Sequence, residues 1–442
     1  MQIIESQGAR TAFLVLMLAT LLAGDAWRYT IGWTGFVILG AALALISVVI
    51  LVVRRGSWKI SALPYPLILF LALTVISLAW SFYPGATALG ILATWCTVIG
   101  GIAVAVIFSW DEILRGLGLA LRAVLGLSLV FEFTVSAIIR APVLPPVPEP
   151  GIDYSNLPDP IPPMLFWSRN ELFQGEKIQG IVGNSTLLSF VALLGMIVFA
   201  IQWASGSVRG TRSLFWIAVA VASLALSRSA TNVIGLAVVA AVAASILLIR
   251  RAHERGNALR TYAALGALAI AGVVGTVIFW TQALGLFGKS SDLTNRTQIW
   301  TDVIALAQQR PVIGWGWVSY WAPWAKPFDT LAENNGVRQL HAHNAWIDVW
   351  FQLGIVGLIV FGLLVLSTLV RSWAFAVDRS EPWTAISGAQ AGAHAAVTML
   401  PVLLVAALLV QSAAESRLLV EFGLFALAVI AVKTKNPQWA HR

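Results

Sequence analysis

The sequence predicts an all-α, polytopic integral membrane protein, and three observations carry this prediction. Hydrophobic residues make up 59% of the 442 residues and charged residues only 11%, against about 25% charged residues in soluble domains. The apolar residues fall in runs of roughly twenty, the length that a helix needs to cross the hydrocarbon core of a bilayer. Because the runs lack strict alternation, helices are favoured over a porin-type barrel.

Hydropathy divides the chain into about twelve candidate spans. The first follows a weakly charged start and lacks an Ala-x-Ala cleavage site, so we expect a retained helix rather than a removed signal peptide. Residues 1–442 are therefore interpreted as a single membrane domain. The predicted spans are 11–27, 31–53, 62–82, 86–109, 114–139, 181–204, 212–227, 230–249, 261–284, 344–370, 389–411 and 415–432.

The positions of lysine and arginine predict the orientation. With a cytoplasmic N-terminus, sixteen of the 28 fall in inside segments, and the short outside loops carry only Arg28, Arg228 and Arg417. Both termini are therefore expected in the cytoplasm. The net charge of +8 follows from this topology, and nucleic-acid binding is not expected. Cys96 is the single cysteine, which excludes a disulfide framework and a cysteine-based metal site.

Two outside loops are longer than ordinary connectors. Residues 140–180 are rich in proline, so this loop is expected to lie extended across the outer face rather than form a long helix. Residues 285–342 have a different composition: positions 297–309 are typical of a helix, with Trp300, Ile304 and Ala307 on one face, and Pro311 follows. We expect a short helix at the membrane interface, followed by a turn rich in glycine and tryptophan.

Arginines on the outer face are candidates for binding an anion. Arg228 lies in a very tight turn between two apolar runs, where a charge near hydrocarbon is costly. Snorkelling to the headgroups is the alternative explanation. Arg296 lies beside Lys289 and just before the expected interfacial helix; a solvated loop arginine is its alternative. Because guanidinium pairs bidentately with phosphate, the two arginines favour a diphosphate held at headgroup depth.

A histidine pair, His341 and His343, precedes Asn344 and a long apolar run. On an extended segment the two side chains point the same way. Zinc binding would require a third ligand, and Glu333 and Asp348 have no recognised zinc spacing. A neutral imidazole is a suitable general base near neutral pH, whereas capping of the next helix is the structural alternative, with Asn344 as a natural N-cap.

Further polar and aromatic residues mark the same region. Glu132 and His394 lie within apolar runs, where ionisable groups are costly, and the sequence assigns neither a role. Tryptophans crowd the second loop and the start of the following span; an interfacial aromatic belt explains most of them, and stacking on sugar rings would also use exposed indoles. These tryptophans are residues 300, 315, 317, 321, 324, 346 and 350.

Taken in order, these motifs resemble the O-antigen ligase and polymerase superfamily of bacterial inner membranes over about a third of the chain. Residues 226–229 (Leu-Ser-Arg-Ser) are similar to its Ser-Arg turn, and residues 295–300 and 311–316 to its Arg-x-x-x-Trp segment and the turn that follows. The block 341–344 (His-Ala-His-Asn), followed by 352–357, is the most specific match. Asn295 and Ala230 stand where the family often has glycine.

The resemblance implies a GT-C-like glycosyltransferase, multi-pass in the bacterial inner membrane, with its active site facing the periplasm. Its donor would be a glycan on undecaprenyl diphosphate, its acceptor lipid A–core oligosaccharide, and its surroundings membrane lipid. This O-antigen ligase reaction is favoured because the extra C-terminal domain associated with protein-modifying members is not seen. O-antigen polymerase and protein O-oligosaccharyltransferase are the alternatives within the superfamily.

The mechanism implied is a single displacement that inverts the anomeric carbon. His343 would deprotonate the acceptor hydroxyl while Arg228 and Arg296 hold the diphosphate. The other residues expected to contact substrate are His341, Asn344, Lys289, Trp300 and Arg338. No cofactor and no metal are expected, because the outer loops offer no DxD-like acid pair. A non-enzymatic transporter of the same lipid-linked glycan would instead place its charges near the bilayer midplane.

Overall fold

The computed structural model describes residues 6–149, 152–278, 291–334, 337–377 and 396–436. These residues are helical apart from short turns, loops and one antiparallel pair, Glu333–Asn334 (β1) with Val337–Arg338 (β2). A helix lies in each of the twelve predicted spans, which confirms the all-α prediction. They are α2 (Gln7–Leu22), α3 (Gly24–Val53), α4 (Tyr65–Ile76), α5 (Pro84–Ile107), α6 (Trp110–Thr134), α7 (Ser185–Ala204), α8 (Gly210–Ser227), α9 (Ala230–Glu254), α10 (Ala258–Ile278), α13 (Ala345–Val377), α16 (Leu400–Ser412) and α17 (Glu421–Lys435).

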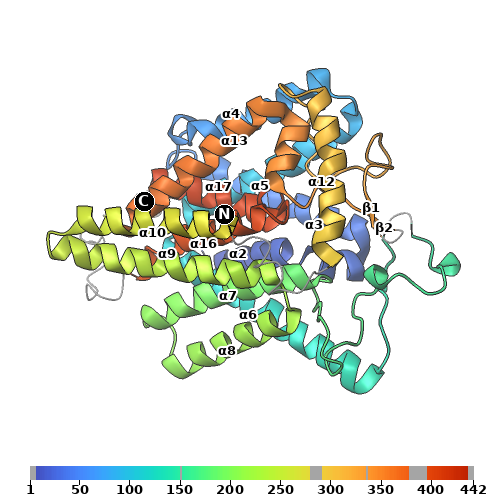
Figure 1. Cartoon of the computed structure of the whole chain (residues 1–442), viewed down its shortest axis with the longest axis horizontal. Coiled ribbons are helices and arrows are strands. Elements are labelled where there is room, and N and C mark those ends of the chain that lie inside the picture. The colour runs from blue at the N-terminus through green and yellow to red at the C-terminus, as the bar shows by residue number, and fades with distance from the viewer. Residues whose placement is uncertain (1–5, 150–151, 279–290, 335–336, 378–395, 437–442) are drawn as a thin grey trace.

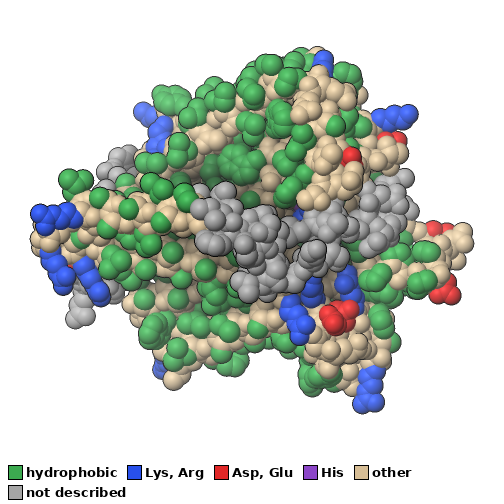
Figure 2. All heavy atoms as spheres, in the orientation of Figure 1, with side chains coloured by type: hydrophobic (Ala, Val, Ile, Leu, Met, Phe, Trp, Pro, Cys, Tyr) green, Lys and Arg blue, Asp and Glu red, His purple; other side chains and the backbone are tan. Residues whose placement is uncertain are grey.

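The surface of the bundle is that of a multi-pass membrane protein. Among the described helices, seven are long and apolar enough to cross a bilayer, and four further apolar helices are shorter. Large hydrophobic side chains on α3, such as Leu45 at 65% exposure, face outward; lipid, unlike water, accommodates them. Figure 2 shows hydrophobic side chains over the helix faces and basic ones at the tip of the α9–α10 hairpin, where Arg251, Arg255 and Arg260 are exposed.

Helix α13 is broken at Gly354, and a segment from the preceding loop fills the break. Gly354 has φ 67° and ψ −165°, outside the helical region. A membrane-embedded break leaves backbone groups that must find partners within the protein. The turn at residues 311–316 supplies them through four bonds: Ile355 N to Pro311 O (2.8 Å), Val356 N to Val312 O (3.2 Å), Trp315 N to Phe351 O (3.0 Å) and Gly316 N to Gln352 O (2.9 Å).

The helix expected at the interface is α12 (Ser291–Gln309), which begins six residues before the predicted 297. Figure 1 shows it running across the direction of the long helices α9 and α10. Its buried face is Ile299, Val303 and Ala307, spaced four residues apart as one helix face requires. Trp300 is half-buried beside this face, so the predicted face was offset by one residue at two of its three positions.

The proline-rich loop 140–180 contains no α-helix among its described residues. Its C-terminal end is held by the carboxylate of Glu132, the buried acid in α6 to which the sequence assigned no role. Glu132 accepts hydrogen bonds from Gln179 N (2.9 Å), Gly180 N (2.7 Å) and Ser168 Oγ (2.8 Å). Its role is therefore to anchor the loop. His394, flagged with it, lies outside the described residues.

Candidate functional site

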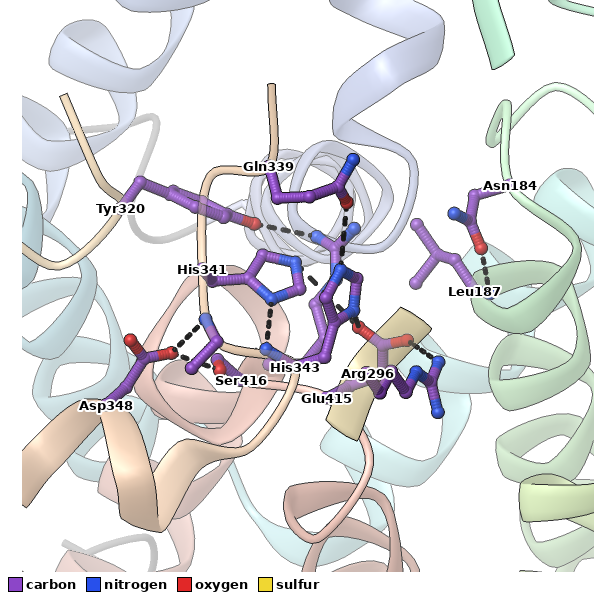
Figure 3. Close-up of polar contacts among 12 residues, drawn as sticks. Asn184, Leu187, Arg296, Tyr320, Gln339, His341, His343, Asp348, Glu415 and Ser416 are labelled. Atoms are coloured by element: carbon purple, nitrogen blue, oxygen red, sulfur yellow. Dashed lines mark hydrogen bonds and ion pairs between the residues drawn. The ribbon is translucent and has the colours of Figure 1, made fainter. Parts of the chain in front are cut away.

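Side chains from three separate segments of the chain meet around one carboxylate, that of Glu415 (Figure 3). Glu415 follows α16, and its side chain is 10% exposed. Oε1 accepts a hydrogen bond from Arg296 Nη2 of α12 at 2.8 Å. Oε2 lies 3.0 Å from Nδ1 of His343, in the loop before α13. Two of the residues predicted to be catalytic, His343 and Arg296, are therefore brought together by a third that the sequence analysis missed.

His343 is oriented through both of its ring nitrogens. While Nδ1 faces Glu415, Nε2 lies 3.0 Å from the side-chain oxygen of Gln339. Because each of these oxygens accepts, both contacts are made by a ring that carries a proton on each nitrogen. When Nε2 has given up its proton, the carboxylate keeps the proton on Nδ1, and Nε2 is then the nitrogen that can take up a proton from a substrate. The side-chain amide of Gln339 occupies the place that an acceptor hydroxyl would need at Nε2, so an incoming acceptor would displace it.

His341 packs against His343, and the lone pair on its Nδ1 already accepts a hydrogen bond. The two ring centroids are 4.1 Å apart, and His341 Nδ1 accepts the backbone N–H of His343 at 3.0 Å. The segment is not extended at this point, since His343 has φ 51°. Burial, and next the neighbouring His343, hold the pKa of His341 well below its usual value. His341 is thus a neutral ring whose only acceptor nitrogen is already occupied.

The charge on Glu415 is stabilised by its neighbours. Burial alone would raise the pKa of this carboxyl, but the charge and hydrogen bond of His343, followed by His341 and Arg296, lower the pKa well below its usual value. His341 Nε2 also approaches Glu415 Oε2, at 3.8 Å. Glu415 is therefore an anion with a different partner on each oxygen.

Hydrogen bonds with side chains of α13 and α12 hold the loop that carries the histidines. Asp348 of α13 accepts hydrogen bonds from Ala342 N (3.0 Å) and Trp321 Nε1 (2.9 Å), and also from Ser416 Oγ. Trp300 of α12 donates Nε1 to Ala342 O at 2.9 Å. The indole nitrogen of Trp300 thus holds the histidine loop.

Asn344 is the N-cap of α13, as the sequence predicted. Its Oδ1 accepts from Trp346 N at 3.0 Å and Ile347 N at 3.2 Å, as N-cap side chains do. Its Nδ2 donates to Ala413 O at 3.1 Å, which ties the start of α13 to the segment leading to Glu415. Both polar atoms of the side chain therefore hold the site together, and its expected contact with substrate stays a prediction.

A second ionic network adjoins the site. Arg417 donates to Tyr320 Oη at 2.9 Å and pairs with Glu421, and Glu421 also pairs with Arg28 of α3 at 3.0 Å. Arg28 pairs in turn with Asp25, so two arginines face two acids. Tyr320 brings this network to the histidines, since its ring centroid lies 6.2 Å from that of His341. Arg28 and Arg417, expected as loop charges, are thus neutralised.

Arg228 stands apart from the Glu415 cluster. It ends α8 in a left-handed conformation (φ 48°), and its side chain is exposed. Its guanidinium lies close to Gly175 of the proline-rich loop, and no ion pair joins it to another described residue. Lys289 lies outside the described residues; Arg338 is placed by its backbone in β2, and its side chain is outside them. The predicted pairing of Arg228 with Arg296 stays a prediction.

The cluster also contains a set of donor atoms that could hold a metal ion. One ligand atom each from His341, His343 and Glu415 lie within 4.8 Å of one another. The sequence offered no third ligand, and Glu415 supplies one from 72 residues beyond His343. The guanidinium of Arg296, 2.8 Å from the same carboxylate, would repel a cation placed there. We therefore interpret the group as a hydrogen-bonded cluster.

Comparisons with known proteins agree with the resemblance seen in the motifs. Residues 213–362 match a family model described as O-antigen ligase, and this range includes Arg228, Arg296 and both histidines but not Glu415. The chain is also 29% identical over 201 residues to the exopolysaccharide production protein ExoQ of Rhizobium meliloti (strain 1021). That alignment covers 42% of this chain and 45% of the relative, so it spans less than half of either protein.

Proposed function

We propose that this chain, a multi-pass membrane protein of the O-antigen ligase superfamily, transfers a glycan from a polyprenyl diphosphate donor to an acceptor hydroxyl. The superfamily consists of membrane glycosyltransferase-like ligases and polymerases that act on lipid-linked polysaccharides. The proposed donor lipid is undecaprenyl diphosphate, and the proposed location is the periplasmic face of the bacterial inner membrane. The distribution of basic residues supports that orientation.

The observation that carries the proposal is the placement of His343 between Glu415 and Gln339, with Arg296 on the same carboxylate. A proton on Nδ1 leaves Nε2 to accept the proton of the acceptor hydroxyl. The acceptor oxygen then bonds to the anomeric carbon as the bond from that carbon to the diphosphate oxygen breaks. Arg296 and Arg228 would stabilise the charge on the departing undecaprenyl diphosphate. A single displacement of this kind inverts the anomeric carbon.

Two acceptors have support, and they define two candidate reactions. Ligation of O-antigen to lipid A–core, expected from the sequence, is supported by the description of the matching family model. Extension of a polysaccharide is supported by the relative whose name assigns it to exopolysaccharide production. We favour extension of a polysaccharide, because the name of the relative describes one protein. The description of the family model applies to a whole family and is therefore less specific.

The test uses the purified chain in lipid nanodiscs with a glycan on undecaprenyl diphosphate. The same donor is offered with a polysaccharide acceptor in one arm and lipid A–core in the other, and products are separated by size. Elongated polysaccharide is the expected result; glycosylated lipid A–core would instead select the ligase reaction. Movement of donor across a bilayer without a new glycosidic bond would overturn the proposal in favour of a transporter.

A further inference from the structure

Among the residues that the structure describes, Glu415 is the one whose side chain contacts both the proposed diphosphate ligand Arg296 and the proposed base His343. Its two oxygens are divided between them, Oε1 to Arg296 at 2.8 Å and Oε2 to His343 at 3.0 Å. The side chains of Arg296 and Glu415 are 15% and 10% exposed, so water competes little for either partner. The charge of Arg296 is therefore already neutralised within the protein.

A diphosphate donor competes with Glu415 for the charge of Arg296. It carries more negative charge than a carboxylate and can take both arms of a guanidinium. If Arg296 stayed on Glu415, the donor would face a neutral pair and the carboxylate would repel it. Of the neighbouring arginines whose side chains the structure describes, Arg28 and Arg417 offer no replacement, because they are paired with Asp25 and Glu421. Donor and Glu415 therefore compete for the same guanidinium.

We propose that Glu415 is a positioning residue that holds Arg296 until the donor binds, and that Arg296 then moves from Glu415 to the diphosphate of the donor. This inference rests on the proposed function, since it takes a polyprenyl diphosphate as the ligand. Once Arg296 has moved, Glu415 has His343 as its remaining close partner. After donor binding, the carboxylate of Glu415 therefore interacts with His343 and no longer with Arg296. The donor must accordingly bind before the acceptor reacts.

The exchange also balances charge during the transfer. The acceptor gives its proton to Nε2 of His343 as its oxygen bonds to the anomeric carbon, and undecaprenyl diphosphate leaves with the electron pair of the broken bond. The imidazolium that forms is hydrogen-bonded to Glu415 through Nδ1–H. The negative charge that grows on the leaving group meets Arg296 instead. Each developing charge therefore has its own counter-ion, and Arg296 must have left Glu415 beforehand.

The decisive variant is Glu415→Gln, which keeps the shape of the side chain and removes its charge. With farnesyl diphosphate as the probe, binding by calorimetry to the purified chain in detergent should become roughly tenfold tighter, because Arg296 no longer has a charged partner to leave. In the transfer assay kcat should fall by about 10²-fold, because the imidazolium loses its counter-ion. Tighter donor binding with slower turnover is a combination that loss of folding does not produce.

Two further variants separate release of Arg296 from a general change in charge. Glu112→Gln is the control for loss of a carboxylate from an ion pair: its carboxylate pairs with Arg10 and with none of the described arginines near the site, so probe binding should stay within about twofold of wild type. In an Arg296→Gln background, Glu415→Gln should no longer tighten binding, as a double-mutant cycle measures directly. Melting temperatures of all variants report folding.

The possible outcomes distinguish failure of the proposed function from failure of the role proposed for Glu415. Wild-type protein that does not bind the probe argues against the proposed function itself. Wild-type binding that is unchanged or weakened by Glu415→Gln in a folded protein overturns the role of Glu415 alone. Tightening that persists in the Arg296→Gln background also overturns it, because the gain then comes from removing a negative charge rather than from freeing Arg296.

Discussion

Arg296 and Arg228 have different surroundings although both were predicted to bind the diphosphate. Arg296 is largely buried and tied to Glu415, whereas Arg228 is exposed beside Gly175. Arg228 is thus the arginine that meets a diphosphate without losing a described partner. If both arginines bind the diphosphate, as predicted, Arg228 can contact the donor at once, whereas Arg296 must first leave its carboxylate.

Replacing either arginine with alanine should lower kcat by about 10²- to 10³-fold, the effect of removing one group that stabilises the developing charge. Lysine should restore only part of the activity, because it lacks the bidentate fork. Transfer rates in nanodiscs measure this, with membrane insertion and melting temperature as the folding control. Wild-type rates in a folded alanine variant would remove that arginine from the site.

The two histidines should respond differently to substitution. His343→Ala is expected to lose about 10²- to 10⁴-fold in turnover while donor binding persists, as for loss of a general base. His341→Ala should have a smaller effect, because its Nδ1 only accepts the N–H of His343. Single-turnover rates with saturating donor separate the two. An inactive His341→Ala beside a fully active His343→Ala would transfer the role of base to His341.

Transfer should continue in the presence of excess EDTA. The basis is the sequence, whose outer loops offer no DxD-like acid pair. In addition, the guanidinium of Arg296 lies 2.8 Å from Glu415 and would repel a cation between the carboxylate and the histidines before the donor binds. The assay compares transfer before and after chelation, and then after adding zinc, magnesium or manganese. Activity that is lost on chelation and restored by one of these ions would mean that His341, His343 and Glu415 act as metal ligands.

Glu415 shows why the site could be predicted only in part. The histidines and Arg296 stand in recognisable motifs, but Glu415 lies 72 residues beyond His343 and outside the residues that match the family model. Hydropathy also placed it inside a predicted span, 415–432, whereas α17 begins at Glu421. A contact between the ends of two helices has no period in the sequence, so only the fold reveals it. The second ionic network, in which Arg417 contacts Tyr320 and Glu421, was missed for the same reason.

At the scale of elements, the break in α13 is what brings the histidine loop to the site. The sequence showed glycines at 314, 316 and 354 as separate signals, and it could not show that the turn at 311–316 bonds to the break at Gly354. The pairing depends on tertiary contact. It fixes one end of the segment 311–344, and Asp348 fixes the other through Ala342.

Gly354→Ala should destabilise the protein by about 2 kcal/mol or more, since a left-handed backbone disfavours a side chain and the new methyl has no space. A Cβ at Gly354 would lie 2.2 Å from the carbonyl carbon of Val312. Gly362, in the same helix, has nothing within 4 Å of such a Cβ, and Gly362→Ala is the matched control with an unchanged or higher melting temperature. Equal melting temperatures for the two variants would contradict this account of the break.

At the scale of the whole molecule, the polar groups of the site gather at one end of the bundle. His343 precedes α13, Glu415 follows α16, Glu421 begins α17 and Arg28 lies near the start of α3, and ion pairs or hydrogen bonds join these ends. A transporter would instead place such groups along a path near the midplane. The sidedness of the loops stays a prediction. That helices form in the predicted spans was predictable from hydropathy, because hydropathy depends on local composition. Which ends meet was not.

The same topology predicts which loops chemical labels reach. The α7–α8 connection and the proline-rich loop 140–180 fall on opposite sides of the predicted membrane, and each has an exposed serine, Ser207 and Ser155. With Cys96, the single native cysteine, replaced by alanine, Ser155→Cys in intact bacterial cells should react with a membrane-impermeant maleimide. Ser207→Cys should react only after the inner membrane is opened, because the basic residues around it keep that connection in the cytoplasm. The reverse pattern would place the Glu415 cluster on the cytoplasmic side, where a periplasmic transfer reaction could not take place.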